Sequence, residues 1–571
     1  MPGNTGKLLR FKVYLEGIRV PFSRGSVGFA RNAPPSGSIQ VPMATPILGL
    51  QDRTHVAVFW YDEVDQQWYL LYDGEARGRG RQKTPHGYGF QIRTTGVTNY
   101  WRSVLVYMAL NMPPVRVSQV QVFGAVGDLD AKNIFPLAQL VDRKSKLLDG
   151  DIEGSFRSIL AKIQGINPFY EDAERRLQFQ TRIFAAPDTN LKRLVALRDF
   201  FEKRFDAHAG TTISDNASIQ SFLDFIADFI YYEWLEIPLP IDLEHQIVYK
   251  PRLYNAAIPA CNFLFPSIYN NLSEDVDFSE EPTRVSAQLN LSMTPGAGST
   301  TAKTYWAPED VQQAFDSAFA DPKKINTSDA ATVERIIKEY HAYLTAEERD
   351  RGVIHVRADM TQTEYALRAP DQKPDEYLKQ LVGFKFFSQR YARRRVQVSG
   401  GWFPEPVPGL PIAVIDSYGS PIVGMLDSIV HSFSPRQGSS SFDIGYARYK
   451  DDPGAAPEAP SWLNKVYADG SIYEELLGVA AFGGPGMAAF TAAEEMAAEY
   501  ARARDAEAAT AFAFHITKRK KLTEAAYWKA LGCDGEENAD VRDGPPFREK
   551  QRKPIRDYIQ EIGGKRGMRA F

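Results

Sequence analysis

A proline-rich corner between strand-like segments most constrains how this chain can fold. Within residues 384–448, the run Pro404-Glu405-Pro406-Val407-Pro408-Gly409-Leu410-Pro411 follows an arginine-rich segment with strand character and precedes two further apolar segments. Proline fixes φ and has no backbone N–H, so this run is excluded from a helix interior and from a central strand. It predicts a stiff corner between antiparallel strands of a β-barrel.

Alternating apolar and polar residues predict strands elsewhere in the chain. Residues 11–15 alternate, and the apolar runs at 55–61 and 68–72 flank a polar turn, as a hairpin would. Further strands are expected at 101–107, 115–123, 285–293 and 353–360. These patterns predict one antiparallel barrel before residue 134 and a second that ends near residue 450.

Helical periodicity dominates the other parts of the chain. Apolar residues recur at helical spacing at 191–205, 219–234 and 329–345, and 487–513 is rich in Ala and Glu. A Pro-rich linker at 451–460 marks the clearest boundary. From Phe547 to Phe571, eight Lys/Arg against three Asp/Glu form a basic tail.

The predicted fold class is therefore α+β and β-dominated, with two antiparallel β-barrel domains. The expected units are a first barrel at 1–133, a helical insertion at 134–245, return strands and a connecting loop at 246–330, a second barrel at 331–450, and a linker, helical extension and basic tail at 451–571. A chain of 571 residues is long enough for several such packing units.

Composition excludes several functional classes. The net charge is −4, which gives no overall attraction to nucleic acid or anionic lipid. The two cysteines, Cys261 and Cys533, lie far apart, so neither a disulfide framework nor a zinc site is expected. The N-terminus lacks the pattern of a signal peptide, and no apolar run is long enough to cross a bilayer. We expect a chain without membrane insertion that folds in a reducing cytoplasm.

No motif predicts catalysis, a cofactor or a metal. Asp427, Ser428 and His431 lie within five residues, but neighbours on one strand point to opposite faces, and a triad is assembled from separate loops. We interpret His431 as a histidine that packs in or caps a strand. The acidic runs at 128–133 and 149–154 lack the spacing of a calcium loop, and the glycines at 483–486 lack the Lys of a phosphate loop.

Two cationic clusters remain. Arg77, Arg79, Arg81 and Lys83 alternate along one segment, and residues 393–395 are three consecutive arginines. A solvated strand face or an ion-pair interface is the common meaning of such a pattern. Contact with nucleic acid is the alternative.

Four collinear segments resemble the central baseplate or tail hub proteins of tailed bacteriophages. The first runs from Val13-Tyr14-Leu15-Glu16-Gly17 to Asn99-Tyr100-Trp101-Arg102. The second spans residues 259–266 and 281–284, the third 345–353, and the fourth is the corner with the hairpin that follows it. The resemblance covers most of residues 10–450 and is weaker after residue 460.

This resemblance implies a structural virion protein in the tail baseplate and no enzyme. It implies a homotrimer in which each subunit contributes two tail-tube-like barrels to a ring around the channel for DNA ejection. Its implied partners are the tail tube protein, the spike or cell-puncturing protein, other baseplate proteins, the tape-measure protein and, in transit, genomic DNA. Arg77, Arg79, Arg81 and Lys83 are candidate channel-lining residues, and the candidate interface or structural residues are Arg284, Trp402, Pro404, Pro406, Pro408, Gly409, Pro411 and His431.

Two alternatives from other classes stay open at the level of sequence. One is a virion-associated cell-wall (peptidoglycan) hydrolase, with the helical insertion at 134–245 as the degradative domain. The other is a module that binds host glycans through exposed aromatic residues.

Overall fold

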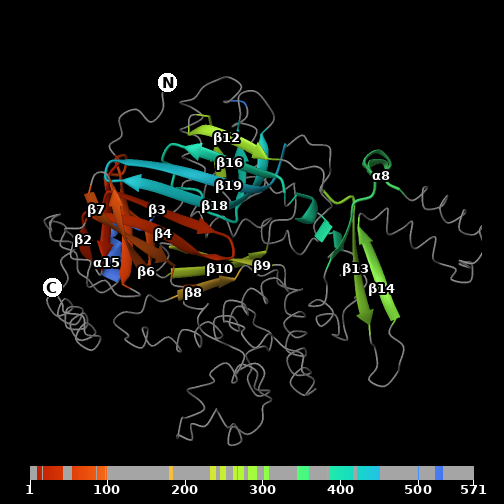
Figure 1. Cartoon of the computed structure of the whole chain (residues 1–571), viewed down its shortest axis with the longest axis horizontal. Helices are drawn as coiled ribbons and strands as arrows, with labels where there is room; N and C mark the ends of the chain where they lie inside the picture. The colour runs from red at the N-terminus through yellow and green to blue at the C-terminus, as the bar shows by residue number, and fades with distance from the viewer. Residues whose placement is uncertain are drawn as a thin grey trace, which may run out of the picture.

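Antiparallel β-structure dominates the computed structural model of the chain (Figure 1). No described helix is both long and apolar enough to cross a bilayer. The structure describes residues 9–15, 17–42, 54–84, 87–96, 98–99, 179–183, 232–238, 245–251, 262–266, 268–275, 281–291, 301–307, 344–358, 382–383, 385–386, 388–391, 393–415, 421–449, 499 and 521–530.

The main element is a 13-stranded sheet that combines strands from residues 11–95 with strands from residues 262–449. Its path runs β12-β16-β19-β18-β3-β4-β7-β6-β5-β1-β2, and β17 pairs with β18 and β11 beside that path. The opening residues supply β1 (Phe11–Leu15), β2 (Ile18–Val20), β3 (Arg24–Ala30), β4 (Ala33–Pro42), β5 (His55–Asp62), β6 (Gln67–Thr84) and β7 (Gly87–Thr95). Later residues supply β11 (Asn262–Leu264), β12 (Tyr269–Asp275), β16 (Arg395–Gly400), β17 (Pro411–Val414), β18 (Ile422–Ser434) and β19 (Gln437–Tyr449).

The β18–β19 hairpin shows how local sequence produces this sheet. Ser434 pairs with Gln437, which leaves a two-residue turn at Pro435 and Arg436. Proline presets the φ of a turn and has no N–H to contribute to a ladder. The strand next to this hairpin in the sheet is β3. Its residues alternate between buried and less buried positions, which places its apolar side chains on the core face.

The two halves of the sheet share one core. β3 pairs antiparallel with β18, from Gly25↔Phe433 to Ala30↔Ser428. Phe11 stacks on Phe433 at 5.1 Å and packs edge-on against Trp402 at 4.8 Å between ring centroids. Since aromatic side chains bury large areas, these contacts join the ends of the described chain into one cluster.

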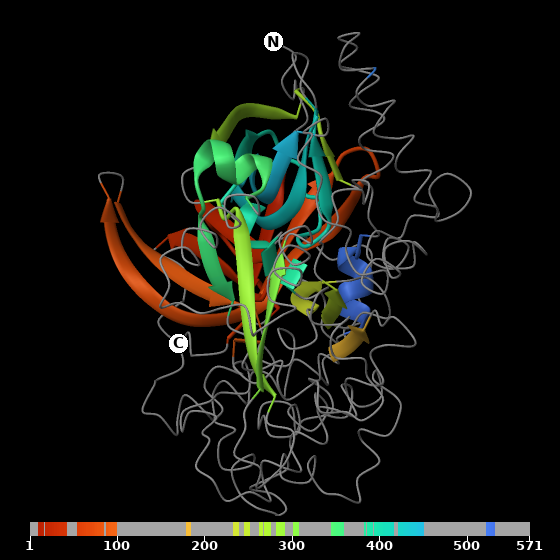
Figure 2. The ribbon, with the colours of Figure 1, turned by 90° about the vertical axis from the view of Figure 1, so that its right-hand side faces the viewer.

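Two smaller sheets flank this body. One has the order β8-β10-β9, from β8 (Phe179–Ile183), β9 (Tyr232–Pro238) and β10 (His245–Pro251). The other has the order β14-β13-β15, from β13 (Arg284–Leu291), β14 (Thr301–Ala307) and β15 (His355–Ala358), with the short helix α8 (Ala346–Arg351) before β15. A second short helix, α15 (Glu524–Ala530), packs on the main sheet and appears in blue in Figure 2.

The β-dominated class is confirmed, and so are the strand at 11–15 and the hairpin that joins β5 to β6. The closed barrels are not found: strands from both predicted barrels share one sheet, whose terminal strands β12 and β2 do not pair with each other, and the remaining described strand of the second barrel, β15, lies in a separate sheet. The physical reason is long-range pairing, because β3 takes β18 as its neighbour across some 400 residues, which no local pattern encodes.

The expected helical insertion also differs where it is described. Tyr232–Pro238 is a strand, although residues 232–234 close the helical pattern predicted at 219–234. Its pairing with β10 over seven residues outweighs local periodicity. The arginine-rich segment before the corner is helical at 388–391 and becomes strand at Arg395. The predictions at 101–107, 115–123, 191–205, 329–343, 451–460 and 547–571 lie outside the described residues.

Candidate functional site

The proline corner is packed inside the chain. Trp402 and Gly409 are buried, and so are the four prolines of the corner, Pro404, Pro406, Pro408 and Pro411. The Gly409 N–H donates to the Leu426 carbonyl at 2.6 Å, and the Leu426 N–H donates to the Leu410 carbonyl at 3.1 Å. Gly409 has φ +76°, a conformation that disfavours residues with a Cβ. The corner is therefore fixed on β18, and its docking on a neighbouring subunit stays a prediction.

Trp402 holds the start of this corner against the main core. Its ring lies 4.8 Å from that of Phe11 and 5.9 Å from that of Trp60. A Cβ added at Gly438 would come within 2.5 Å of the Trp402 ring, so the indole packs directly on the backbone of β19.

His431 lies in this core and is 1% exposed. Its Nδ1 is 3.0 Å from the Ser440 hydroxyl, and its ring is 5.2 Å from that of Trp402. Asp427 instead forms an ion pair with Arg31 at 2.6 Å. There is therefore no hydrogen-bonded triad of Asp427, Ser428 and His431. The histidine packs within a strand, which is the interpretation that the sequence analysis favoured.

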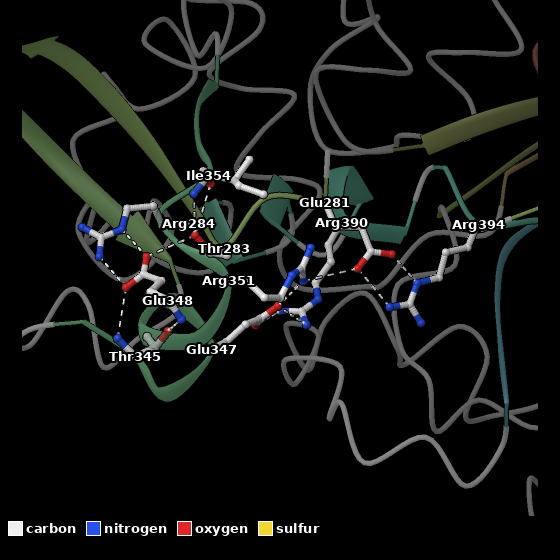
Figure 3. A network of polar contacts seen from close by, with 10 residues as sticks. All are labelled: Glu281, Thr283, Arg284, Thr345, Glu347, Glu348, Arg351, Ile354, Arg390 and Arg394. Atoms are coloured by element: carbon white, nitrogen blue, oxygen red, sulfur yellow. Dashed lines mark hydrogen bonds and ion pairs between the residues drawn. The ribbon is translucent and has the colours of Figure 1, made fainter. Parts of the chain in front are cut away.

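Arg284 is the centre of a buried polar joint (Figure 3). Its guanidinium binds both carboxylate oxygens of Glu348 at 2.5 Å. The same carboxylate accepts the Thr345 N–H at 3.0 Å, and the Glu348 N–H donates to the Thr345 hydroxyl at 3.1 Å, which forms a capping box at the start of α8. Burial opposes ionisation of Glu348, but the bonds from Arg284 and Thr345 outweigh it and lower its pKa.

A second cluster extends this joint toward the main sheet. Arg394 donates to both oxygens of Glu281, at 2.5 and 3.0 Å, immediately before β16. Arg390 makes the same two-point contact with Glu347 of α8, at 2.7 and 2.9 Å, and Arg351 lies 2.6 Å from Glu347 and 3.9 Å from Glu281. The pairs in Figure 3 thus connect β13, α8 and β16. Paired guanidinium and carboxylate groups fix relative orientation because both partners are planar.

The predicted cationic row lies on the hairpin of β6 and β7, which we call the arm and define as residues 76–95. Arg79, Arg81 and Lys83 are exposed, and Arg77 is half-buried. In Figure 2 the two orange strands extend away from the body of the sheet. Arg79, Arg81 and Lys83 occupy alternate positions after a register shift between Ala76 and Gly78, so these three share one face of β6, whereas Arg77 lies within the shift.

Sequence reasoning missed a docking site for the segment 521–530. The Lys521 ammonium lies 2.7 Å from Asp62 and 2.9 Å from Glu405, next to the proline corner. Burial opposes the charge of Lys521, but Glu405 and Asp62 outweigh this effect and raise its pKa. Lys12 binds Glu524 of α15 at 2.7 Å. The signal that could have indicated this site is the pair of aromatic residues at 527–528. Their partners lie some 500 residues earlier in the sequence, so local patterns could not identify them.

Aromatic packing completes this docked segment. Trp528 lies 5.2 Å from Tyr14 and 5.9 Å from Phe59 between ring centroids. The Leu70 N–H donates to the Leu522 carbonyl at 2.8 Å. Residues 521–530 of the C-terminal extension therefore bind this chain's own sheet.

The structure brings the predicted residues together only in part. Trp402, the prolines and His431 share the main core, whereas Arg284 lies in the separate joint and the cationic row on the arm. Within the described residues, no group of three or more His, Cys, Asp or Glu side chains is placed to hold a metal. The functional features are therefore surfaces and joints between elements.

Comparison with known proteins gives matches at the level of structure. No family model and no curated protein matches the chain. It is similar to the tail protein from Neisseria meningitidis MC58, with 10% identity and a TM-score of 0.41, covering 79% of this chain and 99% of that one. It is also similar to the 43 kDa tail protein of prophage MuSo2 from Shewanella oneidensis, with 8% identity and a TM-score of 0.40. That match covers 76% of this chain and 98% of the other.

A third similar structure is a type VI secretion system component of E. coli, described as similar to the T4 bacteriophage tail proteins gp27 and gp5. It shares 9% identity with a TM-score of 0.31, over 79% of this chain and 80% of that one. The structures to which this chain is similar thus include two tail proteins and a secretion-system component described as similar to tail proteins.

Proposed function

We propose that this chain is a structural tail protein, a baseplate hub whose copies form a ring around the tail channel. The observation that carries the proposal is the single main sheet, in which the two segments of hub-like sequence, 11–95 and 395–449, pair side by side. A sheet whose terminal strands, β12 and β2, have no described strand on their outer sides can extend across subunits, which removes exposed edge N–H and C=O groups. Three copies would then form the channel wall from open sheets, in place of the two closed barrels per subunit that the sequence resemblance implies.

Such a ring would adapt a sixfold tail tube to a threefold spike. Its partners would be the tube protein, the spike and other baseplate proteins, with the tape-measure protein and genomic DNA passing through. Arg77, Arg79, Arg81 and Lys83 would border the channel, where their positive charge would face phosphates. The buried joint at Arg284 and the corner at Pro404–Pro411 would act as rigid supports and not as the contact surface itself.

The observed carboxylates offer no support for the hydrolase alternative. In the described part of 134–245, Glu233 is fully buried and lies 2.7 Å from Arg31, and Glu236 is 3% exposed and accepts bonds from Thr98. A glycosidase needs two carboxyl groups across an open cleft. Zymography on purified peptidoglycan should therefore show no clearing by the full chain, and clearing that depends on a carboxylate would refute a purely structural role.

A symmetry-resolved reconstruction of the assembled particle tests the hub directly. We expect three copies of this chain around the tail channel, between the tube and the spike. Density for six copies, or for one copy off the channel axis, would contradict the proposal.

A further inference from the structure

Carboxylates from the β5–β6 hairpin and the proline corner surround the ammonium group of Lys521. Its Nζ lies 2.7 Å from Asp62, 2.9 Å from Glu405 and 3.9 Å from Asp65. Glu405 is 2% exposed, and among the described residues its second carboxylate oxygen has no hydrogen-bond partner. Because a buried carboxylate is destabilising without a counter-charge, this site requires a cation.

Two aromatic rings complete the surroundings of this ammonium group. The ring centroids of Trp60 and Tyr69 are each 4.9 Å from the Lys521 nitrogen, and both residues are buried. An aromatic face attracts a cation, more strongly where water is excluded. We call this site the ammonium cage and define it as Trp60, Asp62, Asp65, Tyr69 and Glu405. Its chemistry fits the compact charge of a lysine side chain.

The residues after Lys521 add a backbone contact and an apolar face. Thr523 forms an antiparallel β-bridge with Tyr69 of β6. Leu522, Tyr527 and Trp528 pack in one buried cluster with side chains of β1, β5 and β6. In Figure 1, α15 lies beside these strands of the opening residues. The segment 521–530 thus docks through an anchoring charge, a strand contact and an apolar face, as bound peptides do.

This segment and its docking site are far apart in the sequence. The contacts described above lie in residues 12–70 and at Glu405. Between the end of β19 at Tyr449 and Lys521 the chain has 71 residues, 450–520. A chain of that length can span up to about 250 Å. The covalent connection therefore permits docking on a neighbouring copy as well as on the chain's own sheet.

We propose that the ammonium cage and the adjoining face of β1, β5 and β6 are a binding site for this lysine-anchored segment, and that neighbouring copies exchange it. The segment 521–530 of one copy then occupies the site of the next. Exchange keeps every contact of the docked segment, so it joins two copies without a new interface. A neighbour held in a ring supplies the segment at high local concentration. The inference rests on the proposed ring for that neighbour, whereas the site itself does not.

Peptide binding to full-length chains tests the site. A chain with Lys521→Glu and Trp528→Ala should have its own segment undocked and its site open. A fluorescent peptide of residues 521–530, with both ends blocked, should bind this double variant saturably in fluorescence anisotropy. The wild-type chain should bind it at least about tenfold more weakly, because its own segment competes. The same peptide with Lys521→Glu should also bind at least about tenfold more weakly, because it lacks the anchor.

Isotope labelling tests the exchange on the wild-type chain, independently of whether the double variant folds. Chains labelled with ¹⁵N and unlabelled chains are mixed before assembly, and a carbodiimide then couples Lys12 to Glu524 and Lys521 to Asp62, pairs that lie 2.7 Å apart. If the segment is exchanged, about half of the cross-linked peptide pairs should join a labelled to an unlabelled partner. Mass spectrometry measures this fraction.

The outcomes separate this inference from the hub itself. Absence of peptide binding to the double variant up to about 1 mM, with native circular dichroism, would overturn the site. Equal binding of the peptide to the double variant and the wild type would also overturn it. Cross-links only between like-labelled partners, in assembled or monomeric chains, would refute the exchange. The particle reconstruction decides the hub, and its failure would leave the peptide result unchanged.

Discussion

At the scale of single residues, the joint at Arg284 depends on one carboxylate. Arg284 is 2% exposed and Glu348 is 2% exposed, so neutralising either leaves the other buried without its counter-charge. Glu348→Gln should keep the capping box, because glutamine can accept the same bonds, yet lower the free energy of unfolding by about 3 kcal/mol. Urea denaturation followed by circular dichroism measures the loss.

The matched control is Glu347→Gln on the same helix. Glu347 is 27% exposed, so its pairs with Arg351 and Arg390 are partly solvated and their loss should cost about 1 kcal/mol or less. Equal losses in the two variants would show that burial does not distinguish the pairs.

The joint should also respond to acid. The pKa of Glu348 is lower in the folded chain than in the unfolded chain, so its contribution to stability is complete above the unfolded pKa and disappears as the pH falls through the folded pKa. The stability difference between the wild type and Glu348→Gln should therefore shrink on acidification below the usual carboxyl range. A difference that grows as the pH falls would contradict this sign.

At the scale of elements, α15 is held to the sheet mainly by its aromatic side chains. Trp528 is 2% exposed and packs on Tyr14 and Phe59. Trp528→Ala should destabilise the docked helix by about 3–5 kcal/mol and release it from the sheet. Hydrogen exchange at residues 524–530 should then become fast while exchange in β18 stays slow.

Tyr527→Phe is the matched control for this element. It keeps the ring and removes only the hydroxyl, which lies 2.8 Å from the His55 ring. A loss of about 1 kcal/mol is expected, with α15 still protected. Release of α15 by Tyr527→Phe alone would show that the polar contact, not the packing, holds the helix.

At the scale of the whole molecule, the first predicted domain should not fold by itself. In the full chain, β3 depends on β18 for its outer neighbour, and the core around Phe11 includes Trp402 and Phe433. A fragment of residues 1–133 would expose that strand edge and that apolar surface to water. We expect it to be insoluble or to bind a hydrophobic dye, and a cooperative thermal transition in the isolated fragment would instead support the independent first barrel.

The sequence by itself determined the strand-rich class, the β5–β6 hairpin, the stiff corner and the packing role of His431, because alternation, turn residues and proline act over a few neighbouring positions. The tertiary structure decided that both strand regions form one open sheet, that Tyr232–Pro238 is a strand, and that residues 521–530 dock beside the corner. It also paired Arg284 with Glu348 and Arg394 with Glu281. Apart from Tyr232–Pro238, whose partner strand β10 follows it closely in the sequence, these features rest on partners 64 or more residues apart. The choice among distant partners is made by packing, which no local pattern records.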